Sequence, residues 1–340
     1  MGFDIFGWLH QLVVGNWGMP MWVYNAAAGT LKALMALVFV LLNVLFLVWL
    51  ERKVAGHIQR RMGPMRTGWH GAFQTLADVF KLISKEDIIP AGADRRVFKL
   101  APIIAFTPAL AVYAVLPFGP NIIARDLNIA LVYIGALGSV IVIAILMAGW
   151  SSNNKWSLLG SMRSAAQLVS YEIPLVVSIV AVAMLAGSLS LREIVESQLG
   201  GVWYILLQPL GFIVFFIASL AELNRGPFDL PEAESELVAG YQTEYSGMRW
   251  AMWMLSEYGA VVSSSAVATA LYLGGWSGPA FLPGAVWFLL KVYVLIFVIM
   301  WVKWSFPRIR VDQLMDVGWK GLVPLSLINL FITGVYVISR

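Results

Sequence analysis

The chain has 340 residues, of which 60% are hydrophobic and only 12% are charged, and its mean hydropathy is +0.79. A soluble domain needs more polar surface than this, so the composition excludes a soluble enzyme and indicates a membrane protein. Cysteine is absent, which excludes disulfides, thiol chemistry and cysteine-ligated iron–sulfur clusters. The three histidines, His10, His57 and His70, lie outside the apolar stretches. We therefore expect no metal site and no redox centre held by this chain's own side chains.

Apolar stretches of membrane-spanning length recur along the chain. A hydrocarbon core of about 30 Å requires about 20 apolar residues in a helix. The sequence therefore predicts an all-α polytopic membrane protein with about eight transmembrane helices, built as a single integral membrane domain over residues 1–340. In chain order, the predicted spans are 26–50, 99–118, 127–150, 164–187, 203–221, 250–274, 283–304 and 319–338.

Lysine and arginine are concentrated in alternate loops. With the span ends that border them, the loops at 51–98, 151–163, 222–249 and 305–318 carry 18 of the 23 basic residues. The positive-inside rule places these four loops in the cytoplasm and both termini on the outer side, which in a bacterium is the periplasmic side of the inner membrane. The same loops hold most of the carboxylates, so we expect them to contact partners in the cytoplasm.

The loop after the fifth predicted span is rich in acids. Pro231 suits the first turn of a helix, and acids near a helix start stabilise its dipole, which accounts for one or two of them. Six acids within 23 residues, beside the single Arg225, exceed what capping needs and favour a functional role. These acids are Glu222, Asp229, Glu232, Glu234, Glu236 and Glu244.

Two further acids, Glu172 and Glu257, lie inside predicted spans, each beside a tyrosine. An acid within the bilayer is costly unless it is paired, protonated or hydrated, and such acids usually mark ion or proton routes. The alternative is a hydrogen bond that only cross-links helices. Lys291, deeper in the seventh predicted span, is either a partner for these acids or extends its ammonium toward its own end of the helix.

The first basic loop contains an amphipathic pattern over residues 73–85. Gln74, Asp78 and Lys81 recur at helical spacing, whereas Phe73 and Phe80 lie on the opposite face. This pattern predicts an amphipathic helix at the membrane interface.

At these positions the sequence resembles the family of H subunits of NADH:quinone oxidoreductase, the quinone-site membrane subunit of respiratory complex I. The resemblance extends in order from about residue 26 to the C-terminus, and the acidic loop is its most specific part. It is carried by Glu51-Arg52-Lys53, Gly63-Pro64, Ala77-Asp78-x-x-Lys81-Leu82-x-x-Lys85-Glu86, Ser170-Tyr171-Glu172, Ala221-Glu222-x-Asn224-Arg225-x-Pro227-Phe228-Asp229-Leu230, the stretch 232–244, and Pro307-Arg308-x-Arg310-x-Asp312-Gln313-Leu314.

The resemblance implies a role in the proton-pumping complex, with a quinone such as ubiquinone as substrate and no catalytic residue or bound cofactor of the chain's own. It implies as partners the peripheral iron–sulfur subunits, the other membrane-arm subunits and membrane lipid, and no nucleic acid. The implied quinone-chamber residues are Glu51, Arg52, Arg61, Asp78, Lys303, Arg308, Arg310 and Asp312. The implied proton-coupling residues are Glu172, Glu222, Arg225, Asp229, Glu232, Glu234, Glu236 and Glu257.

Three positions depart from the family pattern, in which relatives commonly carry Asn at Met65, Val at Thr67 and Pro at Thr75. All three lie on the first basic loop and leave the quinone type open. Two other readings compete with a quinone-linked role. A stand-alone ion antiporter would share the intramembrane acids, but such transporters usually show two similar halves, and no repeat is visible here. The membrane anchor of a ferredoxin- or hydrogenase-linked complex would share much of the sequence without using quinone.

Overall fold

The computed structural model describes residues 20–120, 122–230, 234–279 and 281–339, and the side chains of residues 234 and 235 are outside this description. Within these ranges the fold is helical, and its only β pairing is an isolated bridge between Gly119 and Ile122. The all-α class predicted from the sequence is confirmed.

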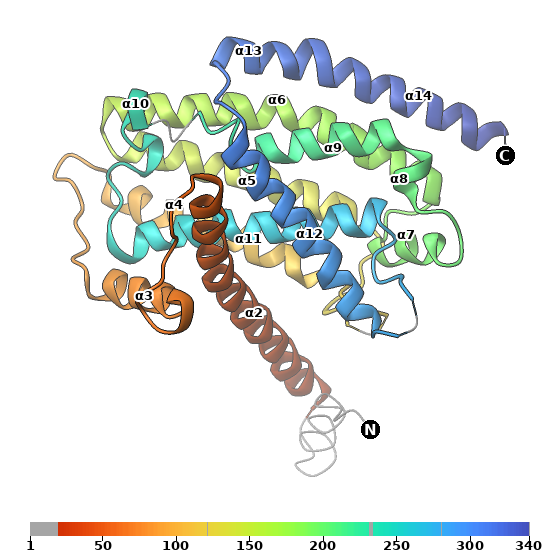
Figure 1. The fold of residues 1–340 in the computed structure, drawn as a ribbon, viewed down its shortest axis with the longest axis horizontal. Coiled ribbons are helices and arrows are strands. Elements are labelled where there is room, and N and C mark those ends of the chain that lie inside the picture. The colour runs from red at the N-terminus through yellow and green to blue at the C-terminus, as the bar shows by residue number, and fades with distance from the viewer. Residues whose placement is uncertain (1–19, 121, 231–233, 280, 340) are drawn as a thin grey trace.

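Eight longer helices form the body of the molecule (Figure 1). They are α2 (Met21–Ile58), α4 (Arg95–Ala111), α5 (Ala130–Ser151), α6 (Lys155–Ala186), α9 (Pro209–Glu222), α11 (Gly247–Tyr272), α12 (Gly284–Ser305) and α14 (Val323–Ser339). The shorter elements are η2 (Trp69–Gly71), α3 (Gln74–Ser84), η3 (Val112–Ala114), α7 (Leu191–Gln198), α8 (Tyr204–Leu207), α10 (Glu234–Leu237), η4 (Gly240–Gln242), α13 (Val311–Asp316) and the π-helical turn η5 (Val317–Leu322).

Within the described residues, six helices are long and apolar enough to cross a membrane. They are α2, α4 with η3, α5, α6, α12 and the continuous α13–η5–α14. A multi-pass membrane protein is therefore confirmed, whereas the predicted count of eight is not. The predicted span 203–221 is divided into α8 and α9, and α9 alone covers only about 21 Å. The predicted span 250–274 corresponds to α11, which is long but is not among the six.

Helix α11 occupies the interior of the bundle. It packs against α4 on one side and α12 on the other, while α6 packs against α5, α9 and α14. In Figure 1, α5, α6, α9 and α11 run side by side and α2 crosses them obliquely. Most of the residues of α11 are buried, among them Ser265, Ala266 and Thr269. Its small and polar side chains therefore face other helices instead of lipid.

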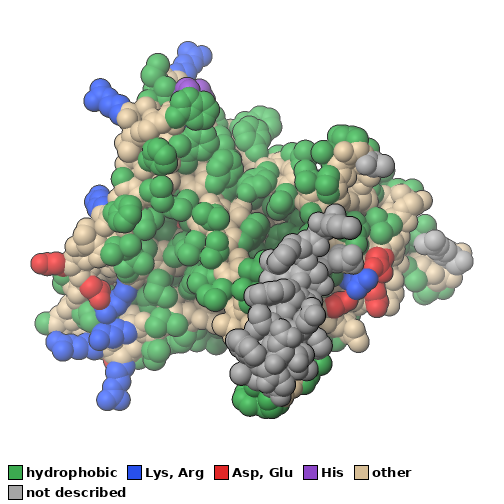
Figure 2. All heavy atoms as spheres, turned by 90° about the horizontal axis from the view of Figure 1, so that it is seen from below, with side chains coloured by type: hydrophobic (Ala, Val, Ile, Leu, Met, Phe, Trp, Pro, Cys, Tyr) green, Lys and Arg blue, Asp and Glu red, His purple; other side chains and the backbone are tan. Residues whose placement is uncertain are grey.

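The surface agrees with a membrane position. In Figure 2, hydrophobic side chains cover much of the described face, and charged side chains gather toward its edges. In Figure 1, α3 and α10, which belong to two of the basic loops, lie at one end of the bundle, and α7 and α8 lie at the other. The direction in which these ends face across the membrane stays a prediction.

Among the described residues, no acid pairs with Lys291. Its ammonium donates hydrogen bonds to the carbonyl oxygens of Leu273, Gly275 and Ser277 at 2.6–3.0 Å and lies 4.3 Å from the centre of the Trp203 ring. These carbonyls follow the C-terminus of α11, where the helix dipole favours a cation. Of the two readings of the sequence, Lys291 therefore reaches a helix end and not the intramembrane acids.

Candidate functional site: a charged cluster and two cavities around α11

Four segments meet at Glu51, a buried acid near the end of α2. Arg225, in the loop after α9, pairs with Glu51 at 3.2 Å between Nη1 and Oε2. Lys303 of α12 donates to the other carboxylate oxygen, and the Tyr258 hydroxyl of α11 donates to Oε2 at 2.8 Å. A buried carboxylate requires such partners, so Glu51 connects α2, α11, α12 and the acidic loop.

The cluster extends to a second acid, Glu257. Arg225 Nη2 lies 3.9 Å from Glu257 Oε2, and its guanidinium carbon lies 4.5 Å from the centre of the Tyr258 ring. The Gln242 amide donates to Glu257 Oε1 at 3.0 Å. Two acids and two cations therefore form one balanced cluster, which we call the Glu51 cluster: Glu51, Arg225, Glu257 and Lys303.

A cavity of about 350 Å³ lies beside this cluster, between α2, α3 and α11. We call it the slot. Its walls are largely apolar and include Leu41, Val44, Leu45, Val48, Met254 and Leu255. Its polar lining consists of Arg52 and Asp78, which pair at 2.6 Å, together with Thr75 and the ring of Tyr258. Its volume and its few polar groups are typical of small-molecule sites.

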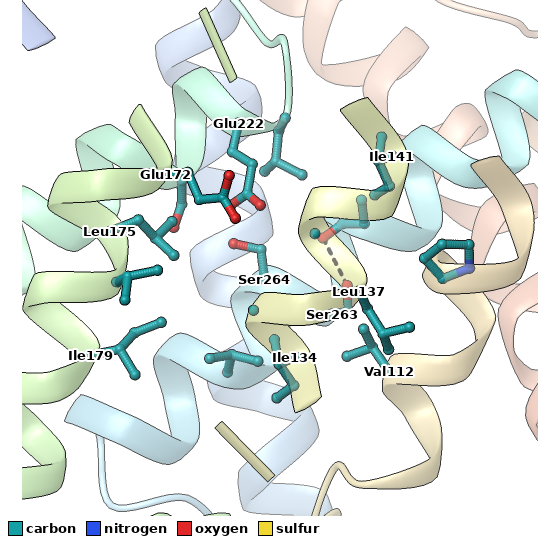
Figure 3. A pocket seen from close by; sticks show the side chains of 18 of the residues that line it. Val112, Ile134, Leu137, Ile141, Glu172, Leu175, Ile179, Glu222, Ser263 and Ser264 are labelled. Atoms are coloured by element: carbon teal, nitrogen blue, oxygen red, sulfur yellow. Dashed lines mark hydrogen bonds between the residues drawn. The ribbon is translucent and has the colours of Figure 1, made fainter. Parts of the chain in front are cut away.

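A second cavity, of about 100 Å³, lies on the other side of α11 and is called the acid cavity. Glu172 of α6 and Glu222 of α9 point toward one another there, as Figure 3 shows. Ser139 of α5 donates to Glu172 Oε1 at 2.5 Å. Ser219, one turn before Glu222, is buried, and its hydroxyl has no hydrogen-bond partner among the described residues. The walls are otherwise mostly apolar, but a cavity of this size with two carboxylates and an unpartnered hydroxyl admits water.

Acids of the 222–244 loop that have no neighbouring cation in the sequence find partners elsewhere in the fold. Asp229 pairs with Arg308 at 3.0 Å, and Glu236 pairs with Arg163 at 2.6 Å. Burial raises the pKa of Asp229, because it outweighs the opposing effect of Arg308 and Lys303. Glu232 lies outside the described residues, as does the side chain of Glu234.

The sixteen candidate residues thus fall into several groups. Glu51, Arg225, Glu257 and Lys303 form the Glu51 cluster, Arg52 and Asp78 line the slot, and Glu172 and Glu222 share the acid cavity. Arg61, Arg310 and Asp312 are exposed: Arg61 contacts Gln59, and Arg310 pairs with Asp312. These three do not line the slot.

The three departures from the family pattern lie on or near α3. Thr75 is buried and lines the slot. The Thr67 hydroxyl donates a hydrogen bond to the side-chain oxygen of Gln74 at 2.8 Å, and the Lys53 ammonium donates one to the sulfur of Met65 at 2.9 Å. Of the three, Thr75 is therefore the one that shapes the slot directly.

Several supporting side chains carry little signal in the sequence. Ser139 and Gly138 sit in the apolar span 127–150, where small residues are ordinary. Asn43 and Tyr293 join α2 to α12 through a hydrogen bond, although each stands as an isolated polar residue in an apolar stretch of sequence. A tyrosine or asparagine within a span indicates an interhelical hydrogen bond, but it does not identify the partner.

Comparison with known proteins decides the family. The family model described as NADH dehydrogenase matches residues 31–334. The chain is 49% identical to one of the NADH-quinone oxidoreductase H subunits of Geobacter sulfurreducens, with 99% of each chain covered. It is 55% identical to the corresponding H subunit of Dehalococcoides mccartyi strain CBDB1 (87% of this chain, 83% of the relative) and 54% identical to that of Geobacillus sp. (88% and 91%).

The chain belongs to the family of NADH-quinone oxidoreductase H subunits. The resemblance stated from the motifs is confirmed. Members of this family are parts of a multi-subunit respiratory complex, so the chain is a membrane subunit of complex I and other subunits of that complex are its expected partners.

Proposed function

We propose that the slot is the access path for quinone and that the Glu51 cluster and the acid cavity couple quinone reduction to proton translocation. One observation carries this proposal. Arg52, Asp78 and Tyr258 line the otherwise apolar slot, and the Tyr258 hydroxyl also donates a hydrogen bond to the buried Glu51.

The chemistry of a quinone fits the slot. A quinone has a polar headgroup with two carbonyls and an apolar tail, so it needs apolar walls and a few hydrogen-bonding groups. The exposed apolar face of α3, with Phe73 and Phe80, provides a lipid-facing boundary from which a tail enters. We assign no redox centre to this chain, and electrons reach quinone from partner subunits.

Coupling follows from the position of α11. Reduction places negative charge on the headgroup, which attracts protons and changes the field at the nearby Glu51 cluster. Met254 and Tyr258 of α11 line the slot, whereas Ser263 and Ser264 of the same helix line the acid cavity. A change at the headgroup therefore has a short route, along one helix, to the paired acids.

The exposed charges serve docking in this proposal. Arg61, Arg310 and Asp312 lie outside the slot and are available to peripheral iron–sulfur subunits in the cytoplasm. This arrangement requires the basic loops to face inward across the bacterial inner membrane, with both termini outside.

A slot-filling substitution tests the access path. Leu45→Trp adds bulk inside the slot, so in the intact complex we expect the KM for a long-tailed quinone to rise roughly tenfold, equivalent to about 1.4 kcal/mol. Electron transfer to a water-soluble acceptor upstream of quinone should stay unchanged.

Leu42→Trp is the matched control, because Leu42 lies one turn earlier on α2 and is 61% exposed. Equal effects of the two substitutions on the KM, or equal loss in both assays for Leu45→Trp, would contradict the access path.

A further inference from the structure

Two neighbouring residues of α5 contact the two carboxylates of the acid cavity separately. Ser139 donates its hydroxyl hydrogen bond to Glu172 at 2.5 Å. Gly138 lies against Glu222, and a Cβ atom added to this glycine would stand 3.0 Å from Glu222 Oε1. No hydrogen-bond donor among the described residues reaches the Glu222 carboxylate. The two acids are therefore not equivalent, although both come from apolar helices.

This difference bears on which acid holds a proton. Two facing carboxylates in an apolar cavity do not both ionise readily, so such a pair retains a proton. A hydroxyl that donates a hydrogen bond favours the ionised form of the carboxylate that accepts it. The described lining of the cavity, drawn from α4, α5, α6, α9 and α11, contains no other titratable side chain. Ser139 is therefore the group that breaks the symmetry.

We propose that the Gly138–Ser139 pair of α5 sets the roles of the two acids: Ser139 holds Glu172 as the anion, and Gly138 leaves room for Glu222 to carry the exchangeable proton. Both are positioning residues that act through the acids. The inference deepens the proposed function, because it rests on the acid cavity being part of the proton route.

Substitution of Gly138 tests whether the space beside the Glu222 carboxylate matters. A contact of 3.0 Å is tighter than ordinary van der Waals distance, but the atom met is the far end of a flexible glutamate. Gly138→Ala therefore displaces the Glu222 carboxylate while leaving the helix backbone in place. Gly29, in α2 and outside the lining of the acid cavity, has nothing among the described residues within 4 Å of an added Cβ, so Gly29→Ala is a control with the same change in helix propensity.

The serine offers a test of proton location that does not depend on turnover. Infrared spectra of the purified complex would be compared between variants in the absorption of protonated carboxyl groups. We expect Glu222→Gln to remove a protonated-carboxyl band at neutral pH and Glu172→Gln to leave it. When Ser139 is replaced by Ala, the proton is shared between Glu172 and Glu222. Addition of Glu222→Gln should then leave a protonated-carboxyl band from Glu172. Ser139→Thr, which keeps the hydroxyl, should restore the original pattern.

The pH profile of quinone-driven proton translocation provides a second readout. Loss of a hydrogen bond to a charged group costs enough to move a protonation equilibrium by about one pH unit. Ser139→Ala should therefore move the profile to higher pH by about one unit, and Ser139→Thr should not. Gly138→Ala should alter the profile, and Gly29→Ala should leave it unchanged.

The two readouts separate this inference from the proposed function. A band that Glu172→Gln removes in the unmodified background, or a band pattern indifferent to Ser139→Ala, would overturn the assignment of roles. The assigned band pattern with an unchanged pH profile in all four variants would uphold the positioning by α5 and contradict the proton route through this cavity.

Discussion

At the scale of single residues, Asp229 illustrates how burial and pairing compete. Its Oδ2 atom accepts from Arg308, whereas Oδ1 is buried without a hydrogen-bond partner among the described residues. The net result is a raised pKa, so the folded chain holds the Asp229 proton more tightly than the unfolded chain does. The contribution of Asp229 to stability is therefore lost as pH rises above the ordinary range of an aspartate.

Arg308→Ala removes the opposing charge, so we expect the pKa of Asp229 to rise further. The variant should lose about 1–2 kcal/mol at pH 8, where Asp229 is ionised without its partner, and less at pH 5. This cost is below that of a fully buried pair because the Arg308 side chain is 38% exposed. Thermal denaturation of the detergent-solubilised complex at both pH values measures the difference. Addition of Asp229→Asn should remove the pH dependence, and a loss equal at both pH values would mean that Arg308 acts through packing alone.

The sequence predicted the kinds of functional residue better than their pairing. The loop motif singled out Glu222, Asp229 and Glu236, but it showed only one arginine nearby. Arg163 and Arg308 come from segments 73 and 79 residues away. Helical periodicity describes neighbours within one helix and carries no information about such distant partners.

At the scale of elements, the break between α11 and α12 depends on one side chain. The chain turns through Gly274 and Gly275, both with positive φ, and Lys291 of α12 binds three carbonyls of this turn. Glycine adopts this conformation at little cost, and the cation compensates the carbonyls exposed at the end of α11.

Lys291→Met should therefore loosen the turn without unfolding α11. We expect faster amide hydrogen exchange over residues 271–279 in the variant, because the carbonyl acceptors lose their common donor. Lys99→Met, at an exposed position, is the control for the loss of a lysine. Unchanged exchange in this segment would show that the Trp203 contact and the backbone hydrogen bonds suffice.

The long helices were predictable because a run of about twenty apolar residues is the length that crosses the membrane as a helix. The predicted spans at 127–150 and 283–304 agree with α5 and α12 to within a few residues. The division of 203–221 was not predicted, although Gln208 and Pro209 stand at the break and a proline suits the first turn of a new helix. Hydropathy averages over such a break, because the residues on both sides are apolar.

At the scale of the whole molecule, Glu51 contacts groups that lie 174 to 252 positions away in the chain. The two acids and two cations of the Glu51 cluster balance, so removal of one charge leaves an uncompensated charge in the interior. Breaking a buried pair in this way costs about 3–5 kcal/mol.

Glu51→Gln should therefore sharply reduce the amount of chain in the assembled complex, as measured on native gels of solubilised membranes. Glu51→Gln with Lys303→Met restores the balance and should recover much of the assembly. Glu51→Gln with Lys320→Met is the control, because Lys320 is exposed and pairs with Asp316 away from the cluster. Equal recovery in both double variants would show that the balance of the cluster does not govern assembly.

The interior position of α11 also has a consequence for how the chain is made. A helix with few lipid-facing apolar residues partitions weakly into the bilayer as it leaves the translocon, and it needs helices already present to receive it. The neighbours α4 and α2 are synthesised earlier and offer surfaces that α11 covers. Truncated chains ending after α11 should therefore integrate this segment, whereas α11 placed alone in a carrier protein should pass through the membrane. Insertion of α11 thus depends on helices made before it, because the hydropathy of α11 alone is too low.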